Sequence, residues 1–322
     1  MEGGLEEGEG EVSEHRPSAL RGLWALTARE LKKWLKEPIV LTVAVLQPVI
    51  WMALFGRAVN LGAIVLSGLA NAPLPDLVPV PGGYVVPPTS GVVYVRSEWL
   101  SQLLSSVSAR AVEGVFGTPD YFSYMAVGMA SMIVVFTSTF SGMSIVWDRR
   151  LGFLDKVLST PVPRAAIILS KTLSASLRAA FQVAVVLAIA AALGLRLGPT
   201  FTPLNLLGVC AAVLLLSTAL STLFLALALR STRHEVQVAV VNLASMPLVF
   251  TSNTFVPVEV MPEWIRAAAT VNPVSYFNDA LRQLTIFALD PVRLAVDFAY
   301  LGASAAALFV VGAVLSWRYL TK

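Results

Sequence analysis

Charged residues are scarce in this 322-residue chain: Lys, Arg, Asp and Glu make up 13% of it, against roughly 25% in an ordinary globular domain. Cysteine is scarcer still, and the single Cys210 excludes a disulfide framework within the chain. Two histidines, His15 and His234, are too few for a histidine–cysteine metal cluster. The net charge of +3 is too small to suggest nucleic-acid binding.

Sequence motifs of catalysis are also missing. The chain has no Gly-x4-Gly-Lys-Ser/Thr loop for nucleotide phosphates and no Gly-x-Ser-x-Gly elbow for a nucleophilic serine. His234 beside Glu235 fits a solvated loop pair better than an acid–base device. We therefore predict that the chain is not an enzyme by itself, and that it holds no cofactor and no metal.

Long apolar stretches are what the sequence has in abundance, since 56% of its residues are hydrophobic. Stretches of about 20 apolar residues are long enough to cross a bilayer as helices. Pro48 and Pro247 fall inside two of them, where kinks are expected. The sequence predicts an all-α integral membrane protein with six transmembrane helices, near Ile39–Val59, Phe122–Val146, Leu173–Leu193, Leu204–Leu229, Val236–Phe255 and Leu294–Trp317.

The distribution of Lys and Arg predicts the orientation. Fifteen of them lie in the segments on one side of these spans, and seven lie on the other side. Because positive charge is enriched in short cytoplasmic loops, the first side is predicted to be the cytoplasm. Both termini are then cytoplasmic, and the protein is expected to be a multi-pass protein of the plasma membrane.

The N-terminal region divides in two. Residues 1–19 are rich in Glu and Gly and predict a disordered acidic tail. Residues 20–37 place apolar side chains on one face and Arg29, Lys32, Lys33 and Lys36 on another. This pattern predicts an amphipathic helix in the membrane interface, in contact with lipid, although an ordinary packed helix has the same pattern.

Two outer segments complete the predicted organisation. Residues 60–120 read as an extracytoplasmic loop insert in the transmembrane domain of residues 20–322, with a helix from about Ser97 to Val115. Residues 257–290 are too polar to form another span. They carry an apolar stripe of Tyr276, Phe277, Ala280, Leu281, Leu284 and Phe287.

A short charged segment from Trp147 to Arg164 lies between the second and third spans. Apolar residues recur there at three- and four-residue steps, which predicts a short amphipathic helix. Pro161 and Pro163 would end it. The residues of the stripe are Leu151, Leu154, Val157 and Leu158.

This segment resembles the type-2 ABC exporter permeases, particularly the drug-resistance branch. The matching residues are Asp148, Gly152, Leu154, Thr160, Pro161, Val162, Arg164 and Lys171. A second matching stretch follows in the expected order, with Phe255-Val256-Pro257, Met261-Pro262, Asn272-Pro273-Val274-Ser275-Tyr276 and Arg282. The resemblance covers about Leu20 to Lys322, and it does not account for the acidic tail or most of residues 60–117. For residues 257–290 it implies short outer-leaflet helices before the last span, although amphipathic outer helices also serve plain packing.

The resemblance implies the membrane-spanning permease subunit of an ATP-driven efflux transporter. Two copies, or this chain and a related permease, would form a homodimer or heterodimer, and separate P-loop ATPase subunits would bind ATP and Mg. Phe153 and Leu154 are expected to insert into a groove on the ATPase, because an exposed apolar pair needs a partner to cover it. The residues expected to couple the two subunits are Asp148, Arg149, Arg150, Gly152, Phe153, Leu154, Asp155, Lys156, Pro161 and Arg164.

Small polar residues are concentrated in the second and fifth spans, which the resemblance places beside the central cavity of a dimer. Helix packing is the other use of such residues in membranes. Arg178 in the third span is near enough to the cytoplasmic end to extend toward the interface. The candidates for a translocation path are Thr137, Ser141, Asn242, Ser245 and Thr251.

Two other classes stay open at this point. An ion-coupled secondary carrier would need an embedded acidic residue, whereas Asp148, Glu259 and Asp297 fall at the ends of spans. A non-transporting membrane scaffold is the second class. An exporter with scattered hydroxyls in an apolar lining would favour a lipophilic or amphipathic substrate.

Overall fold

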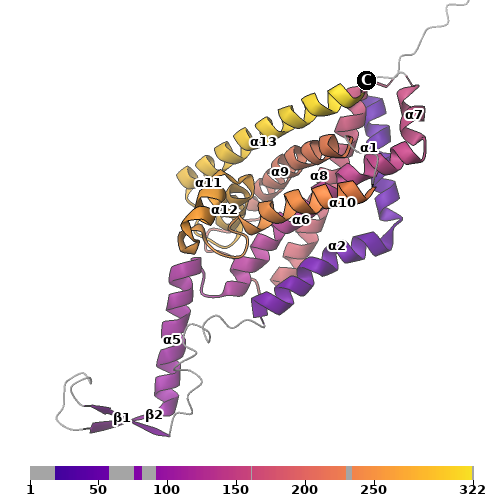
Figure 1. The fold of residues 1–322 in the computed structure, drawn as a ribbon. Coiled ribbons are helices and arrows are strands. Elements are labelled where there is room, and N and C mark those ends of the chain that lie inside the picture. Colours follow the sequence, from indigo (N-terminus) through magenta and orange to yellow (C-terminus); the bar gives the residue numbers. More distant parts are fainter. Residues whose placement is uncertain (1–18, 58–75, 82–91, 161, 230–233, 321–322) are drawn as a thin grey trace, which may run out of the picture.

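The computed structural model describes residues 19–57, 76–81, 92–160, 162–229 and 234–320. The predicted acidic tail up to residue 18, most of residues 60–91 and Pro161 lie outside the described residues. The chain forms a bundle of long helices, from which one helix and a hairpin project (Figure 1). Its elements are α1 (Ala19–Leu35), α2 (Pro38–Trp51), the π-helix η1 (Met52–Arg57), β1 (Leu77–Pro81), β2 (Val92–Arg96), α5 (Ser97–Phe116), α6 (Tyr121–Arg150), α7 (Phe153–Leu158), α8 (Arg164–Ala192), α9 (Asn205–Leu229), α10 (His234–Phe250), the 3₁₀ turn η3 (Val258–Val260), α11 (Glu263–Val271), α12 (Pro273–Thr285) and α13 (Pro291–Leu320).

Helices α6 and α9 form the centre of the bundle. Every side chain of α6 from Phe122 to Val135 is buried, and α9 packs against α6, α8, α12 and α13. Ser138 of α6 and Ser217 of α9 approach to 3.3 Å between their hydroxyl oxygens, which is the close contact that small residues permit between membrane helices. A large apolar core surrounds these helices, and a smaller one lies beside α7.

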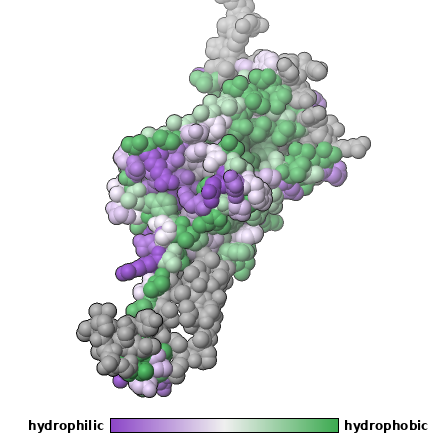
Figure 2. Space-filling model, turned by 60° about the vertical axis from the view of Figure 1, so that its left-hand side comes forward, coloured by the Kyte–Doolittle hydropathy of each residue, from purple (hydrophilic) through white to green (hydrophobic). Residues whose placement is uncertain are grey.

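The predicted all-α membrane architecture is confirmed in its main features. Within the described ranges, five helical segments are long and apolar enough to cross a membrane: Pro38–Gly56, Ala109–Arg150, Arg164–Ala192, Asn205–Leu229 and Pro291–Trp317. The helices α2 and α13 expose most of their apolar side chains. Figure 2 shows hydrophobic residues over a broad area of the bundle, with a hydrophilic patch on its left side at mid-height.

Helix α10 is shorter than the span predicted from Val236 to Phe255, because it ends at Phe250. The next residues are polar and form turns, and the carbonyl oxygens of Asn253 and Thr254 accept hydrogen bonds from Arg282 instead of continuing the helix. At the other proline in a predicted span, Pro48, the helix passes four residues later into η1.

The projecting part combines a predicted and an unpredicted element. The helix expected from Ser97 to Val115 is confirmed as α5. The expectation of an all-α chain is wrong for residues 77–81 and 92–96, where β1 and β2 pair in antiparallel register, with Leu77 opposite Arg96 and Pro81 opposite Val92. β-branched residues favour β2, and β1 accommodates its prolines because each strand of a two-stranded sheet is an edge strand.

The two short helices predicted before the last span are present, but they differ in burial. In α11, Trp264 and Val271 are exposed. In α12 the predicted stripe packs into the bundle, with Phe277, Ala280 and Leu281 fully buried against α6, α9 and α13. Helix α12 is therefore part of the core and does not lie on its surface.

Candidate functional site

The charged segment of the sequence folds as a compact turn at one end of the bundle, which we call the α7 end. Helix α6 ends at Arg150, and Gly152 then takes a left-handed conformation with φ of 67°. Glycine reaches this conformation without steric cost, so the chain turns sharply into α7. Extended backbone at Pro163 then allows α8 to begin at Arg164.

Four charged residues from three helices meet beside this turn, and we call them the ion cluster. Lys171 of α8 lies between two carboxylates: its Nζ is 2.8 Å from Glu30 of α1, and it also pairs with Asp148 of α6. Arg29 pairs with Glu30 at 3.0 Å and lies 4.0 Å from Asp148. Two positive and two negative charges therefore offset one another in a largely buried site.

Burial is the largest single influence and tends to raise the pKa of the Glu30 carboxyl, but Lys171, Arg29 and Arg178 together hold that pKa below its ordinary value. The glutamate is therefore ionised at neutral pH. The cluster fixes the N-terminal helix α1 to the ends of α6 and α8 that lie beside α7. Among the described residues, no group of three or more His, Cys, Asp and Glu could hold a metal ion.

A second contact joins α1 to α7. The guanidinium of Arg29 stacks 3.5 Å from the centre of the Phe153 ring. Leu154 and Val157 are 4% and 8% exposed, packed with Ile145 and Leu225 in the smaller core. The chain itself buries Leu154, whereas Phe153 is only partly buried. The insertion of this pair into a groove on the ATPase stays a prediction, and in this structure Leu154 is not exposed for it.

The apolar side chains that this turn does expose are different ones. Leu151 is 71% exposed, Trp147 46% and Leu158 36%. Arg150, Asp155, Lys156 and Arg164 are exposed around them, whereas Arg149 donates a 3.4 Å hydrogen bond to the carbonyl of Leu229. Of the ten residues predicted for coupling, Arg150, Asp155, Lys156 and Arg164 are exposed, and Arg149, Gly152 and Phe153 are partly buried. Leu154 is buried, Asp148 lies inside the ion cluster, and Pro161 lies outside the described residues.

The residues predicted for a translocation path divide into two groups. Ser141 and Ser245 are buried; Ser141 donates to the Lys171 carbonyl, and Ser245 pairs with Thr139. This placement favours helix packing for these two. Thr137 is partly buried and donates to Gln182 at 2.6 Å.

Asn242 is exposed on α10, and Thr251 accepts a hydrogen bond from Asn272 at 3.1 Å. Arg178 donates from Nε to the Ser174 carbonyl, one turn nearer the α7 end, which is the direction predicted from the sequence.

A buried arginine organises the opposite end of the bundle. Arg282 of α12 is fully buried, and its Nη2 donates to the carbonyls of Asn253 at 2.9 Å and Thr254 at 3.1 Å. Its guanidinium also lies 3.5 Å from the centre of the Tyr124 ring. Gly128 allows this packing, since a Cβ there would lie 2.4 Å from the Thr254 carbonyl oxygen.

Two features of these sites were not predicted. Glu30 was missed, and the available sequence signal was a lone acidic side chain among the basic residues of an amphipathic helix. The role of Arg282 was also missed, although the residue belongs to the second motif. The sequence signal for this role was the presence of a charged residue within the apolar stripe of residues 276–287.

Comparison with known proteins extends these observations. The model of the ABC-2 type transporter family matches residues 83–286. The transport permease ycf38 of Cyanophora paradoxa is 23% identical over 266 residues, which cover 82% of this chain and 74% of the relative. The transport permease ycf38 of Porphyra purpurea is 29% identical over 161 residues, which cover 48% of this chain and 54% of the relative.

A bacterial relative is also similar. The daunorubicin resistance ABC transporter permease protein DrrB1 of Streptomyces coeruleorubidus is 27% identical over 167 residues, covering 52% of this chain and 58% of the relative. The matched regions thus span little more than half the length of DrrB1 and of the Porphyra protein. The family match itself covers more than half of this chain, and with the two motifs and the apolar helices it shows that the chain belongs to the ABC-2 type transporter family of membrane permease subunits.

Proposed function

We propose that this chain is the membrane-spanning subunit of an ATP-driven exporter, driven by separate P-loop ATPase subunits that carry ATP and Mg. The observation that carries this proposal is the turn at the α7 end. It presents Leu151, just before the short helix α7, and Leu158, the last residue of α7, among charged side chains between two spans. Apolar anchors ringed by charges are the usual anatomy of a protein–protein contact.

The contacts beneath this surface support a coupling role. Helix α7 is held through Leu154 and Val157, and α1 is joined to it through Arg29 and Phe153. The ion cluster then links α1 to α6 and α8. A displacement of α7 by an ATPase subunit would therefore reach two spans directly, which would bias the bundle between inward- and outward-open states.

The orientation proposed from the charge distribution places the α7 end in the cytoplasm of a plasma-membrane protein, with both termini inside and residues 60–120 outside. Exposed Leu20, Trp24 and Leu35 on α1 would then rest on the inner leaflet. We include α10 as a sixth span. Its 17 residues extend about 25 Å, and the turn that follows would complete the crossing of a hydrocarbon core of about 30 Å.

The face formed by α2, α6 and α10 supports pairing with a second permease, identical or related. Figure 1 shows α6 between α2 and α10. Both flanking helices expose large apolar side chains on the surface, among them Val43 and Leu46 of α2 and Leu243 and Met246 of α10. Asn242 lies on α10, and we place it with Thr137 and Thr251 beside the path of a lipophilic or amphipathic substrate.

Co-purification tests the docking surface. The chain would be expressed with the P-loop ATPase encoded nearest to it. Leu151→Gln should reduce the retained ATPase at least tenfold, because it replaces an exposed anchor, without changing membrane insertion. Leu204→Gln is the matched control, since Leu204 is equally exposed, at 71%, but lies at the other end of the bundle. Equal retention by both variants would contradict the assignment.

A separate measurement tests the orientation. In a Cys210→Ser background, a cysteine at Ser159 should be protected from an impermeant thiol reagent in intact cells and should react after lysis. Ser159 is exposed, so its protection would report the side of the membrane and not burial. Labelling from outside would overturn the proposed topology.

A further inference from the structure

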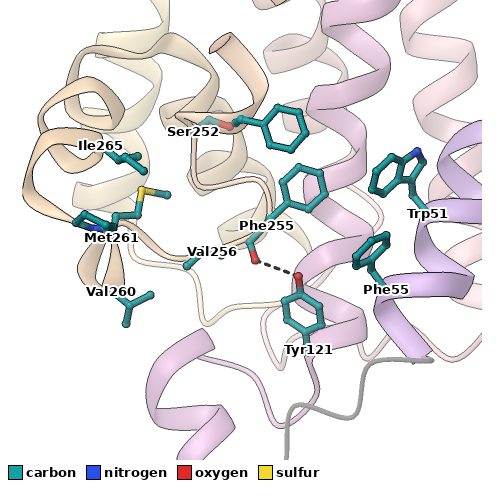
Figure 3. Close-up of a pocket in the computed structure, with 11 residues that line it drawn as sticks. Trp51, Phe55, Tyr121, Ser252, Phe255, Val256, Val260, Met261 and Ile265 are labelled. Carbon is teal, nitrogen blue, oxygen red and sulfur yellow. Dashed lines mark hydrogen bonds between the residues drawn. The ribbon is translucent and has the colours of Figure 1, made fainter. Parts of the chain in front are cut away.

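An open, almost entirely apolar pocket lies at the end of the bundle opposite α7. Its volume is about 510 Å³, which is in the range that holds a drug-sized molecule. Figure 3 shows the rings of Trp51 and Phe55 on one side and Val260, Met261 and Ile265 on the other. Its walls come from α2, η1, the start of α6, the end of α10 and the segment from Phe255 into α11.

Aromatic rings dominate one half of this pocket in two stacked pairs. Trp51 and Phe55 have ring centres 5.0 Å apart at 17°, and Phe250 and Phe255 have ring centres 5.5 Å apart at 20°. Trp51 and Phe255 join the two pairs at 6.2 Å. The π-helix η1 carries Phe55, and π-helical turns in membrane and soluble proteins occur often at functional sites.

The two hydroxyl groups of the pocket are already engaged. The Tyr121 hydroxyl donates to the Phe255 carbonyl at 3.2 Å, and Ser252 donates to the Val249 carbonyl at 2.6 Å. None of the described side chains that line the pocket is charged. A charged ligand group would lose its hydration there without gaining a partner, so the pocket selects against it.

We propose that this pocket binds an uncharged, planar aromatic group of the transported substrate. The inference rests on the proposed export function and adds the class of substrate. Flat rings stack on or against the edges of aromatic side chains, and such contacts contribute beyond the area that they bury. An acyl chain has no flat face to use these rings, and the saturated wall of Val260, Met261 and Ile265 is confined to the other side of the pocket.

Photolabelling of the full chain in lipid nanodiscs tests the proposal without an ATPase or transport. Benzophenone is the neutral aromatic probe, and Met261 in the pocket wall is its expected attachment site. Pyrene should compete at least tenfold better than adamantane, hexadecane or the cationic 1-pyrenemethylammonium. Phe55→Leu combined with Phe250→Leu should reduce the labelling of Met261 at least tenfold. Phe140→Leu is the matched control, because Phe140 is an exposed phenylalanine of α6 outside the pocket.

Three results would overturn the proposal. Equal competition by hexadecane would identify a pocket for acyl chains. Labelling that is seen only for monomers in detergent would show that a second copy fills the pocket in the membrane. Unchanged labelling of the double variant would show that the rings do not bind the probe. None of these results bears on the ATPase co-purification, so failure of the exporter proposal and failure of this one are distinguishable.

Discussion

The guanidinium of Arg29 stacks face-on against the ring of Phe153, 3.5 Å from its centre, and so joins the N-terminal helix to the turn that follows α6. Such a contact contributes about 0.5–2 kcal/mol, depending on its exposure to water. Phe153→Leu keeps an apolar side chain but removes the ring. We expect this variant to insert normally and to lose several-fold in substrate transported per ATP hydrolysed, measured in proteoliposomes with the ATPase. Phe153→Tyr keeps the ring and is the control; if both variants transport alike, the stacked pair has no part in coupling.

Lys171 offsets two buried carboxylates, so its removal should be costly. Lys171→Met removes the cation that pairs with both Glu30 and Asp148, and the remaining paired cation, the half-exposed Arg29, lies 4.0 Å from Asp148. Breaking a buried ion pair in this way costs roughly 3–5 kcal/mol of unfolding free energy. Denaturant unfolding in detergent measures the loss, and adding Glu30→Gln and Asp148→Asn to Lys171→Met should recover part of it. A Lys171→Met variant as stable as the parent would refute the pairing.

The ion cluster also predicts a pH dependence. The pKa of Glu30 is lower in the folded chain than its ordinary value, because Lys171, Arg29 and Arg178 together outweigh the effect of burial. Its stabilising contribution is therefore complete above the pKa of the unfolded state, and it is lost as the pH falls through the lowered folded value. The difference in melting temperature between the parent and Glu30→Gln should be greatest at neutral pH and shrink toward pH 3. A difference that stays constant over this range would argue against the assignment.

Close packing at Gly128 gives a prediction with an internal control. A Cβ at this position would lie 2.4 Å from the Thr254 carbonyl oxygen and 3.1 Å from Arg282 Nη2. Gly128→Ala should therefore force α6 and the turn after α10 apart, at a cost of about 1–3 kcal/mol typical of overpacking. Gly302→Ala on α13 meets nothing within 4 Å and should change the melting temperature little. Similar melting temperatures for the two variants would show that Gly128 and Thr254 are not closely packed.

The long helices were predictable, because apolar runs of membrane length are a local property of the sequence. The ends of these helices were not, because distant residues decide them. Helix α10 stops at Phe250 where Arg282 binds the carbonyls that follow, and nothing in the local sequence indicates this. The hairpin of β1 and β2 was missed for a similar reason, since its first strand contains Pro79 and Pro81, which usually argue against a strand.

The candidate site was predicted in its residues but not in its contacts. Asp148 and Lys171 were recognised from motif spacing, whereas their partner Glu30 is 141 residues from Lys171 in the chain. The apolar spacing of Leu151, Leu154, Val157 and Leu158 predicted a helix correctly, but it could not tell which of the four face the bundle. The aromatic pocket joins residues from separate segments, each unremarkable alone, so only the folded chain brings them together.

Helix α6 is held at both ends, by the ion cluster through Asp148 and by the close contact of Gly128 with the turn at Thr254. It is a continuous helix of 30 residues and therefore about 45 Å long. A rod of that length acts as a lever: a tilt of about 5° about one end moves the other end by about 4 Å. Because the helix is continuous, such a tilt would carry with it Tyr121, which lines the aromatic pocket, with no unwinding between the two ends.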